Sequence, residues 1–216
     1  MPYVRLQLDP NTPTTVRKFV VGSVENLYFS DIHAMFRLPM PDRNVGAGQN
    51  FAIAQILMAV IGGVSTTLYN QEGETGDLFK GVIEEYFPWD AEPVLEVTPR
   101  AASAIIYDVF RNPLTHSAGM FMNWRGNKRY LVHKNYVVKV KRLLDQTKTK
   151  GHTEKWLENL EASRTRPRMG KTLKVVSHKK VLLVEGLYWG VRRMIEKLTT
   201  DVVRMQKAEK FLRSYT

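Results

Sequence analysis

An uncharged segment of nineteen residues, Phe51 to Tyr69, constrains the fold more than any other feature of the chain. A run of this kind either crosses a bilayer, which takes about 20 apolar residues, or fills the centre of a protein core. No basic cluster flanks the segment to set a membrane topology, and polar or glycine residues dilute it: Gln55, Gly62, Gly63, Ser65, Thr66 and Thr67. We therefore expect a buried central helix, with a membrane span as the less favoured alternative.

Apolar residues at helical spacing predict further helices around this segment. They recur every three or four residues from Thr14 to Leu38 and again from Asp77 to Phe87. Thr98 and Pro99 are typical of the N-cap and first residue of a helix, which we expect to continue through Phe110. One long closing helix is predicted from apolar residues that share a face: Leu187, Val191, Met194, Leu198, Val202, Met205 and Leu212.

The pattern changes to strands between the fourth helix and the last. Tyr130 to Val132 and Tyr136 to Val140 predict a short hairpin, and Leu173 to Val176 with Val181 to Val184 predict a second one. The polar, basic segment between them, Lys148 to Met169, indicates only one short helical patch.

These elements predict a mainly α protein, a helical bundle with a basic, partly β insertion before the C-terminal helix. We expect residues 1–122 to form the first part of the bundle, residues 123–185 the insertion, and residues 186–216 the closing helix. The chain has 216 residues, of which 44% are hydrophobic and 25% charged. This composition is typical of a water-soluble globular protein, and the length suffices for a sizeable core.

Positive charge is concentrated in the insertion. The whole chain carries 32 Lys and Arg against 21 Asp and Glu, a net charge of +11. The 60 residues from Asn123 to Leu182 hold 17 of the basic residues and 4 of the acidic ones. A polyanion is therefore the expected partner. Aromatic residues lie among the charges, which favours nucleic acid over an anionic membrane.

The expected nucleic-acid contacts combine cations that bind phosphate with rings that stack on unpaired bases. They are Trp124, Arg125, Lys128, Arg129, Tyr130, Lys134, Tyr136, Lys139, Lys141 and Arg142, together with a basic arm of Arg164, Arg166, Arg168 and Lys171 that orders on binding. The alternative is a solvated edge hairpin whose lysines prevent aggregation. The excess of charge is larger than that role needs, so we favour RNA or another nucleic acid.

The composition also excludes several kinds of site. Cysteine is absent, which excludes disulfides, thiolate metal sites and cysteine nucleophiles. No two of the five histidines are spaced as an i, i+4 helical pair, so we expect no metal. We expect no cofactor either, because Thr165 occupies the position where a phosphate-binding loop ending in Gly170-Lys171-Thr172 needs glycine. The first residues lack the apolar core of a signal peptide, and a cytoplasmic location is expected.

Catalytic chemistry is most plausible between Tyr107 and Gly119. We expect Pro113 to begin a new helix with Asn112 as its cap in a bend, because proline does not continue the preceding helix. Arg111 then ends one helix, and His116 lies one turn into the next. A guanidinium can bind a phosphate at two points, and an imidazole can transfer a proton near neutral pH. The bend would direct both groups at one bound phosphate.

This run, Arg111-x4-His116 with Asn112 after the arginine, resembles the Arg-x4-6-His motif of HEPN domains. These are all-helical proteins found among prokaryotic toxin and defence ribonucleases. The resemblance extends loosely over Thr14 to Phe121 and Gly186 to Tyr215, and the basic insertion is a departure from it. It implies a homodimer whose two copies build one metal-independent site for RNA cleavage, and a possible antitoxin or other regulatory protein as partner.

By the same resemblance, Arg111 would stabilise the scissile phosphate, Asn112 would orient it, and His116 would assist attack by the ribose 2′-hydroxyl, which leaves a cyclic phosphate. Two alternatives stay open. The three residues can be structural, with Arg111 paired to Asp108, Asn112 as a cap and His116 in the core. The protein can also bind nucleic acid or form a complex without cleaving.

Overall fold

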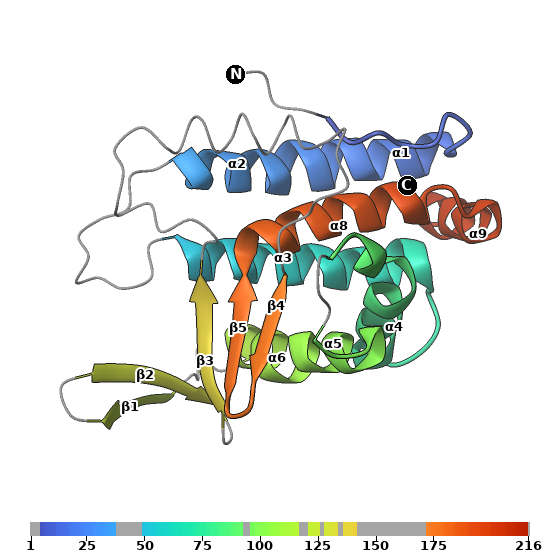
Figure 1. Ribbon diagram of the computed structural model, residues 1–216. Helices are drawn as coiled ribbons and strands as arrows, with labels where there is room; N and C mark the ends of the chain where they lie inside the picture. The colour runs from blue at the N-terminus through green and yellow to red at the C-terminus, as the bar shows by residue number, and fades with distance from the viewer. Residues whose placement is uncertain are drawn as a thin grey trace.

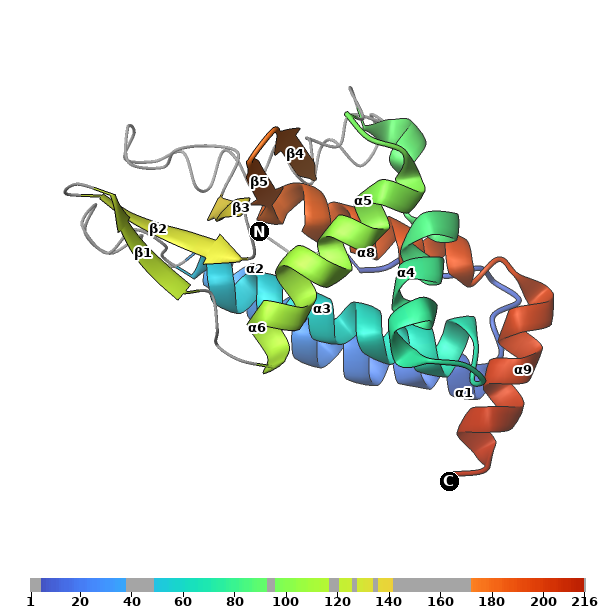
Figure 2. The same cartoon turned by 90° about the horizontal axis from the view of Figure 1, so that it is seen from below.

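The chain forms a helical core with one mixed β-sheet on its side, as seen in the computed structural model (Figures 1 and 2). The structure describes residues 5–37, 49–92, 96–116, 121–125, 128–133, 136–141 and 172–215. Most of the described residues lie in helices, which confirms the expected mainly α fold class. The short helical patch expected between Lys148 and Met169 lies outside these residues.

The first helix runs as one ribbon through α1 (Thr14–Phe19), the π-helical segment η1 (Val20–Phe29) and α2 (Ser30–Arg37). It follows the segment predicted from Thr14 to Leu38. Its buried face consists of apolar residues at helical spacing, among them Val16, Val20, Val24, Phe29, Ile32 and Phe36.

The uncharged segment forms the central helix, α3 (Asn50–Val64) continued by the π-helical η2 (Ser65–Tyr69). α3 contacts α2, η1, α4, α6, α8 and the strand β3, which explains why it carries no charge. Among the described residues it is the one helix long and apolar enough to cross a membrane, and half of its most apolar window is buried inside the molecule. A core helix has the same properties.

α4 begins and ends close to the predicted positions, and α5 begins at the predicted Pro99. α4 (Thr75–Tyr86) is followed by the short 3₁₀ segment η3 (Trp89–Ala91). α5 (Pro99–Ile105) has Pro99 as its first residue, and the Thr98 hydroxyl accepts a hydrogen bond from the Ala101 amide at 3.3 Å. This N-cap is the one that the sequence predicts.

The sheet has five strands in the order β1-β2-β3-β5-β4. The first predicted hairpin is β2 (Lys128–His133) with β3 (Tyr136–Lys141), and the second is β4 (Leu173–Val176) with β5 (Lys179–Leu183). Two features were not predicted. β1 (Phe121–Arg125) adds an antiparallel strand beside β2, and β3 pairs with β5 in parallel, which joins both hairpins into one sheet.

Acidic side chains from the segment before α5 cover the outer edge of β4. The Thr172 amide donates to Glu92 Oε1 at 2.7 Å, and the Val175 amide donates to Glu96 Oε2 at 2.8 Å. These carboxylates bind backbone groups that an edge strand otherwise leaves open to pairing with another chain.

The expectation of one long C-terminal helix is wrong, because the segment forms α8 (Val184–Leu198) and α9 (Val202–Arg213). The hydroxyls of Thr199 and Thr200 donate to carbonyls of the preceding turn, both at 2.8 Å. Asp201 then caps α9 by accepting from the Arg204 amide at 3.0 Å. Hydroxyl and carboxylate groups that compete for backbone partners end one helix and begin the next.

Arg204 fixes α9 against the central helices. Its guanidinium donates to the Tyr69 carbonyl at 2.8 Å and to the Tyr86 hydroxyl at 3.0 Å, and it lies 3.0 Å from a Glu85 carboxylate oxygen. The Tyr86 hydroxyl in turn donates to Asp201 at 2.7 Å. Burial, together with this hydrogen bond to Asp201, raises the pKa of Tyr86 above its ordinary range. The tyrosine therefore stays neutral and keeps donating at physiological pH.

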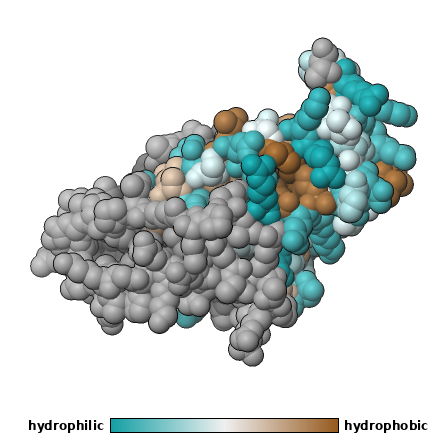
Figure 3. Space-filling model, turned by 90° about the horizontal axis from the view of Figure 1, so that it is seen from above, coloured by the Kyte–Doolittle hydropathy of each residue, from teal (hydrophilic) through white to brown (hydrophobic). Residues whose placement is uncertain are grey.

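Among the described residues visible from above, the surface is mainly hydrophilic with smaller apolar areas (Figure 3). The large apolar side chains that are exposed among the described residues lie at Leu27 and Tyr28 on η1, Val176 on β4, Val202 and Val203 on α9, and Tyr215.

Candidate functional site

Arg111 and Asn112 lie on one continuous helix, which corrects the expected bend. α5 is followed without interruption by the π-helical η4 (Ile106–Arg111) and by α6 (Asn112–His116). Asn112 has helical dihedral angles, φ −60° and ψ −49°, and its amide donates to the Tyr107 carbonyl five residues back. The wider π-helical turn accommodates Pro113, which has no amide hydrogen to donate. Asn112 is therefore not an N-cap.

The Asn112 side chain instead contacts its neighbour. Arg111 Nη1 donates to Asn112 Oδ1 at 3.0 Å, and both side chains are partly exposed. This hydrogen bond directs the amide oxygen at the guanidinium and fixes one edge of the cation. Arg111 and Asn112 are thus brought together as expected, by a different local geometry.

Two cations contact the ring of Tyr107. The guanidinium carbon of Arg111 lies 5.2 Å from the centre of the Tyr107 ring, and Lys80 Nζ of α4 lies 5.6 Å from the same centre. Both distances are typical of cation–π contacts. A side chain at Gly76 would place its Cβ 2.7 Å from the Tyr107 hydroxyl oxygen, so glycine lets the ring lie against α4.

Lys80 also pairs with Asp77, at 2.8 Å between Nζ and the carboxylate oxygen. The hydrogen bond that Lys80 donates to Asp77 is the main cause that raises the pKa of Lys80, which is therefore charged throughout the physiological range. Sequence reasoning missed Lys80, because it lies on another helix and no spacing connects it with Arg111.

His116 is the last residue of α6, and its side chain lies outside the described part of the structure. Positions five apart on a regular helix lie about 140° apart around its axis and roughly 7.5 Å apart along it. Because the helix is not interrupted between them, its backbone turns positions 111 and 116 toward different directions.

The predicted nucleic-acid contacts fall mostly on the sheet or beyond the described residues. Trp124 and Arg125 lie in β1, Lys128, Arg129 and Tyr130 in β2, and Tyr136 and Lys141 in β3, all with side chains outside the description. Lys134, Arg142, Arg164, Arg166, Arg168 and Lys171 lie outside the described residues altogether. Lys139, in β3, is partly exposed.

The pairing of β3, β5 and β4 divides their residues between two faces. Val138, Val140, Leu173 and Leu182 are buried in the hydrophobic core. Lys139 and Lys174 are each opposite Val181, and Lys179 is opposite Val176 in the next row. Directly opposed residues share a face and faces alternate along a strand, so these three lysines lie on the face away from the core.

This lysine face, Lys139, Lys174 and Lys179, contains no acidic residue in any of its three strands. Lys139 and Lys174 lie on either side of β5, about 10 Å apart at two strand spacings. η4, which carries Arg111 at its end, packs against β5. Lys174 and Lys179 were missed as site residues, although the alternation within Leu173–Val176 was a signal that could have placed Lys174 on the outer face.

Among the residues that the structure describes, no group of three or more His, Asp or Glu side chains is arranged to hold a metal ion. Comparison with known proteins gives no match: no family model, no curated protein and no solved structure is significantly similar to this chain.

Proposed function

We propose that this protein binds RNA through the lysine face of its sheet. The observation that carries the proposal is the separation of the two faces. One face of β3, β5 and β4 is buried in the core, and the other carries Lys139, Lys174 and Lys179, which are exposed or partly exposed, without a single carboxylate from the same strands. Cations spaced along a sheet bind a phosphate backbone and carry little sequence preference.

Fluorescence anisotropy of a labelled single-stranded RNA, measured over a range of salt concentrations, tests this proposal. Each phosphate contact adds about 0.7 to the slope of log affinity against log salt for a single strand. Replacing Lys139, Lys174 and Lys179 by Gln should weaken binding and lower the slope by about 2.

The matched control replaces three exposed lysines elsewhere, Lys18, Lys207 and Lys210, by Gln. It removes the same charge from the chain and should leave the slope unchanged. If both triple variants bind RNA alike, net charge and not the lysine face causes the affinity, and the proposal is wrong.

A second function, RNA cleavage of the HEPN type, is favoured by one specific contact. Arg111 and Asn112 are hydrogen-bonded to each other and partly exposed, and Lys80 lies on the same tyrosine ring as Arg111. This is a cationic group suited to a phosphate. Because positions five apart on one continuous helix face different directions, we propose that His116 of a second copy completes the site, in a homodimer.

Incubation of labelled RNA with the protein in the presence of a chelator tests cleavage. The expected products end in a cyclic phosphate, and both His116→Ala and Arg111→Gln should abolish them while RNA binding persists. Mixing the two variants should restore part of the activity, since a mixed dimer contains one intact pair. Cleavage that is absent, or equally strong in His116→Ala, removes the enzymatic proposal and leaves RNA binding as the function.

A further inference from the structure

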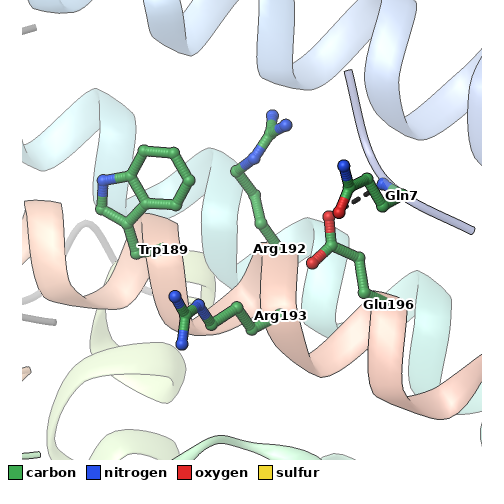
Figure 4. A pocket seen from close by; sticks show the side chains of 5 residues that line it. All are labelled: Gln7, Trp189, Arg192, Arg193 and Glu196. Carbon is green, nitrogen blue, oxygen red and sulfur yellow. Dashed lines mark hydrogen bonds between the residues drawn. The ribbon is translucent and has the colours of Figure 1, made fainter. Parts of the chain in front are cut away.

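A hollow of about 300 Å³ lies beside α8, on a part of the molecule that the proposed function does not use. It is lined by Gln7, Trp189, Arg192, Arg193 and Glu196 (Figure 4). Four of these residues come from two consecutive turns of α8, and Gln7 belongs to the segment before α1. The volume is at the lower end of the range for small-molecule sites.

Two walls of the hollow are fixed by contacts within the protein. The backbone N–H of Gln7 donates to Glu196 Oε1 at 2.9 Å, which holds the segment before α1 over α8. Arg192 is only 2% exposed, and its Nη1 donates to the Tyr188 hydroxyl at 3.2 Å. Its guanidinium carbon also lies 5.3 to 5.5 Å from the centres of the Phe29, Tyr188 and Trp189 rings. The charge is therefore held in place before any ligand arrives.

Arg193 supplies the accessible cation. Its side chain is partly exposed, and in Figure 4 it leaves α8 in a different direction from Arg192, on the side where Trp189 lies. Within the described part of the chain, no ion pair or hydrogen bond of its side chain is seen. The lining holds two cations against one carboxylate, Glu196, so its net charge is positive and attracts an anion.

We propose that this hollow binds a nucleotide. The Arg193 guanidinium has the planar pair of donors that matches a phosphate, and the charge of Arg192 adds to the positive potential. The Trp189 indole offers an aromatic surface for a base. The Glu196 carboxylate has acceptor capacity beyond its bond to Gln7, which suits a ribose hydroxyl or an amino group. Four of the five lining residues thus have a counterpart in a nucleoside phosphate.

Calorimetric titration with adenosine 5′-monophosphate tests the proposal on the full chain. Saturable binding of one nucleotide per chain is expected, and adenosine without phosphate or inorganic phosphate alone should bind at least about tenfold more weakly, since each lacks part of the contacts. Arg193→Gln should weaken nucleotide binding by at least about tenfold, with partial rescue in Arg193→Lys.

Lys207→Gln is the matched control, because it removes one exposed cation from α9 and should leave nucleotide affinity within about twofold. Arg193 is partly exposed, so its variants should fold, and circular dichroism verifies this. Absence of saturable binding, or equal affinity in wild type and Arg193→Gln, overturns the proposal.

The nucleotide could be free or be the 5′ end of an RNA. A 5′-phosphorylated oligonucleotide that displaces adenosine 5′-monophosphate better than its 5′-hydroxyl counterpart indicates an RNA end, and equal displacement indicates a free nucleotide. The variant with Gln at Lys139, Lys174 and Lys179 should keep its nucleotide affinity. A failure of RNA binding at the sheet therefore leaves the nucleotide proposal intact. A failure of nucleotide binding likewise leaves the proposal of RNA binding at the lysine face intact.

Discussion

At the scale of single residues, Glu209 connects α9 with the first turn of α1. α1 begins after Pro13, which offers no side-chain cap. Glu209 of α9 takes that role, since its Oε2 accepts from the amides of Thr15 and Val16 at 3.0 and 3.1 Å. Its Oε1 accepts from the Thr15 hydroxyl and from Arg213 Nε, both at 2.8 Å. One carboxylate thus satisfies the first amides of α1 from a distant helix.

Glu209→Gln should destabilise the protein by about 1–3 kcal/mol, because an amide group then faces donors that the carboxylate oxygens accept from. Urea unfolding near neutral pH measures the loss. Glu84→Gln, on an exposed face of α4, is the matched control and should change stability by less than about 0.5 kcal/mol. Equal effects of the two variants would show that Glu209 does not act as a cap.

The pH dependence of that difference has a defined sign. Burial by itself raises the pKa of Glu209, but the hydrogen bonds from Thr15, Val16 and Arg213 outweigh it and hold the pKa below its ordinary value of 4.5. A depressed pKa adds stability above the unfolded value, and this is lost as the pH falls through the folded value. The stabilities of wild type and Glu209→Gln should therefore converge on acidification below about pH 4.5.

At the scale of elements, the contact of α8 with the end of α4 depends on Gly190. A Cβ at this position would lie 1.9 Å from the Phe87 ring, and Phe87 is only 2% exposed. Gly190→Ala should therefore lower stability by about 1–3 kcal/mol or more, because the ring has little space to move into. Thermal unfolding followed by circular dichroism measures this.

Gly63→Ala provides the control in α3, since Gly63 is exposed and a Cβ there meets nothing within 4 Å. Alanine in a helix interior should raise stability by about 0.5–1 kcal/mol relative to glycine. Opposite signs for the two substitutions are expected, and a loss of similar size in both would contradict the role assigned to Gly190.

Patterns within one element were predictable from the sequence, and contacts between elements were not. Periodicity located the helices and hairpins, and Thr98-Pro99 located a helix start. Periodicity did not show the break at Thr199–Asp201, because α8 and α9 both bury apolar side chains in the same core. The parallel pairing of β3 with β5 depends on residues far apart in the chain. The same limit hid the contact of Lys80 and Arg111 with one tyrosine ring, and it hid the close approach of the Phe87 ring to Gly190.

At the scale of the whole molecule, the sheet and the helices share one core. Val138, Val140, Leu173 and Leu182 belong to the same buried cluster as α3 and α8. α3 contacts β3, and β5 leads directly into α8. The described strands β3, β4 and β5 are therefore part of the packing that stabilises the helices. A rigid lysine face follows from this arrangement, because its strands are held from behind by the core.

Leu182→Ala tests this coupling. Leu182 is fully buried on the inner face of β5, so truncation should cost about 2–5 kcal/mol through lost contacts and a residual cavity. Far-ultraviolet circular dichroism during urea unfolding reports mainly on the helices. If the core is shared, this helical signal should be lost in one transition at a lower urea concentration. Val176→Ala, at a β4 position 46% exposed, should hardly move the midpoint. A helical transition that stays at the wild-type midpoint in Leu182→Ala would mean that the helices unfold independently of the sheet.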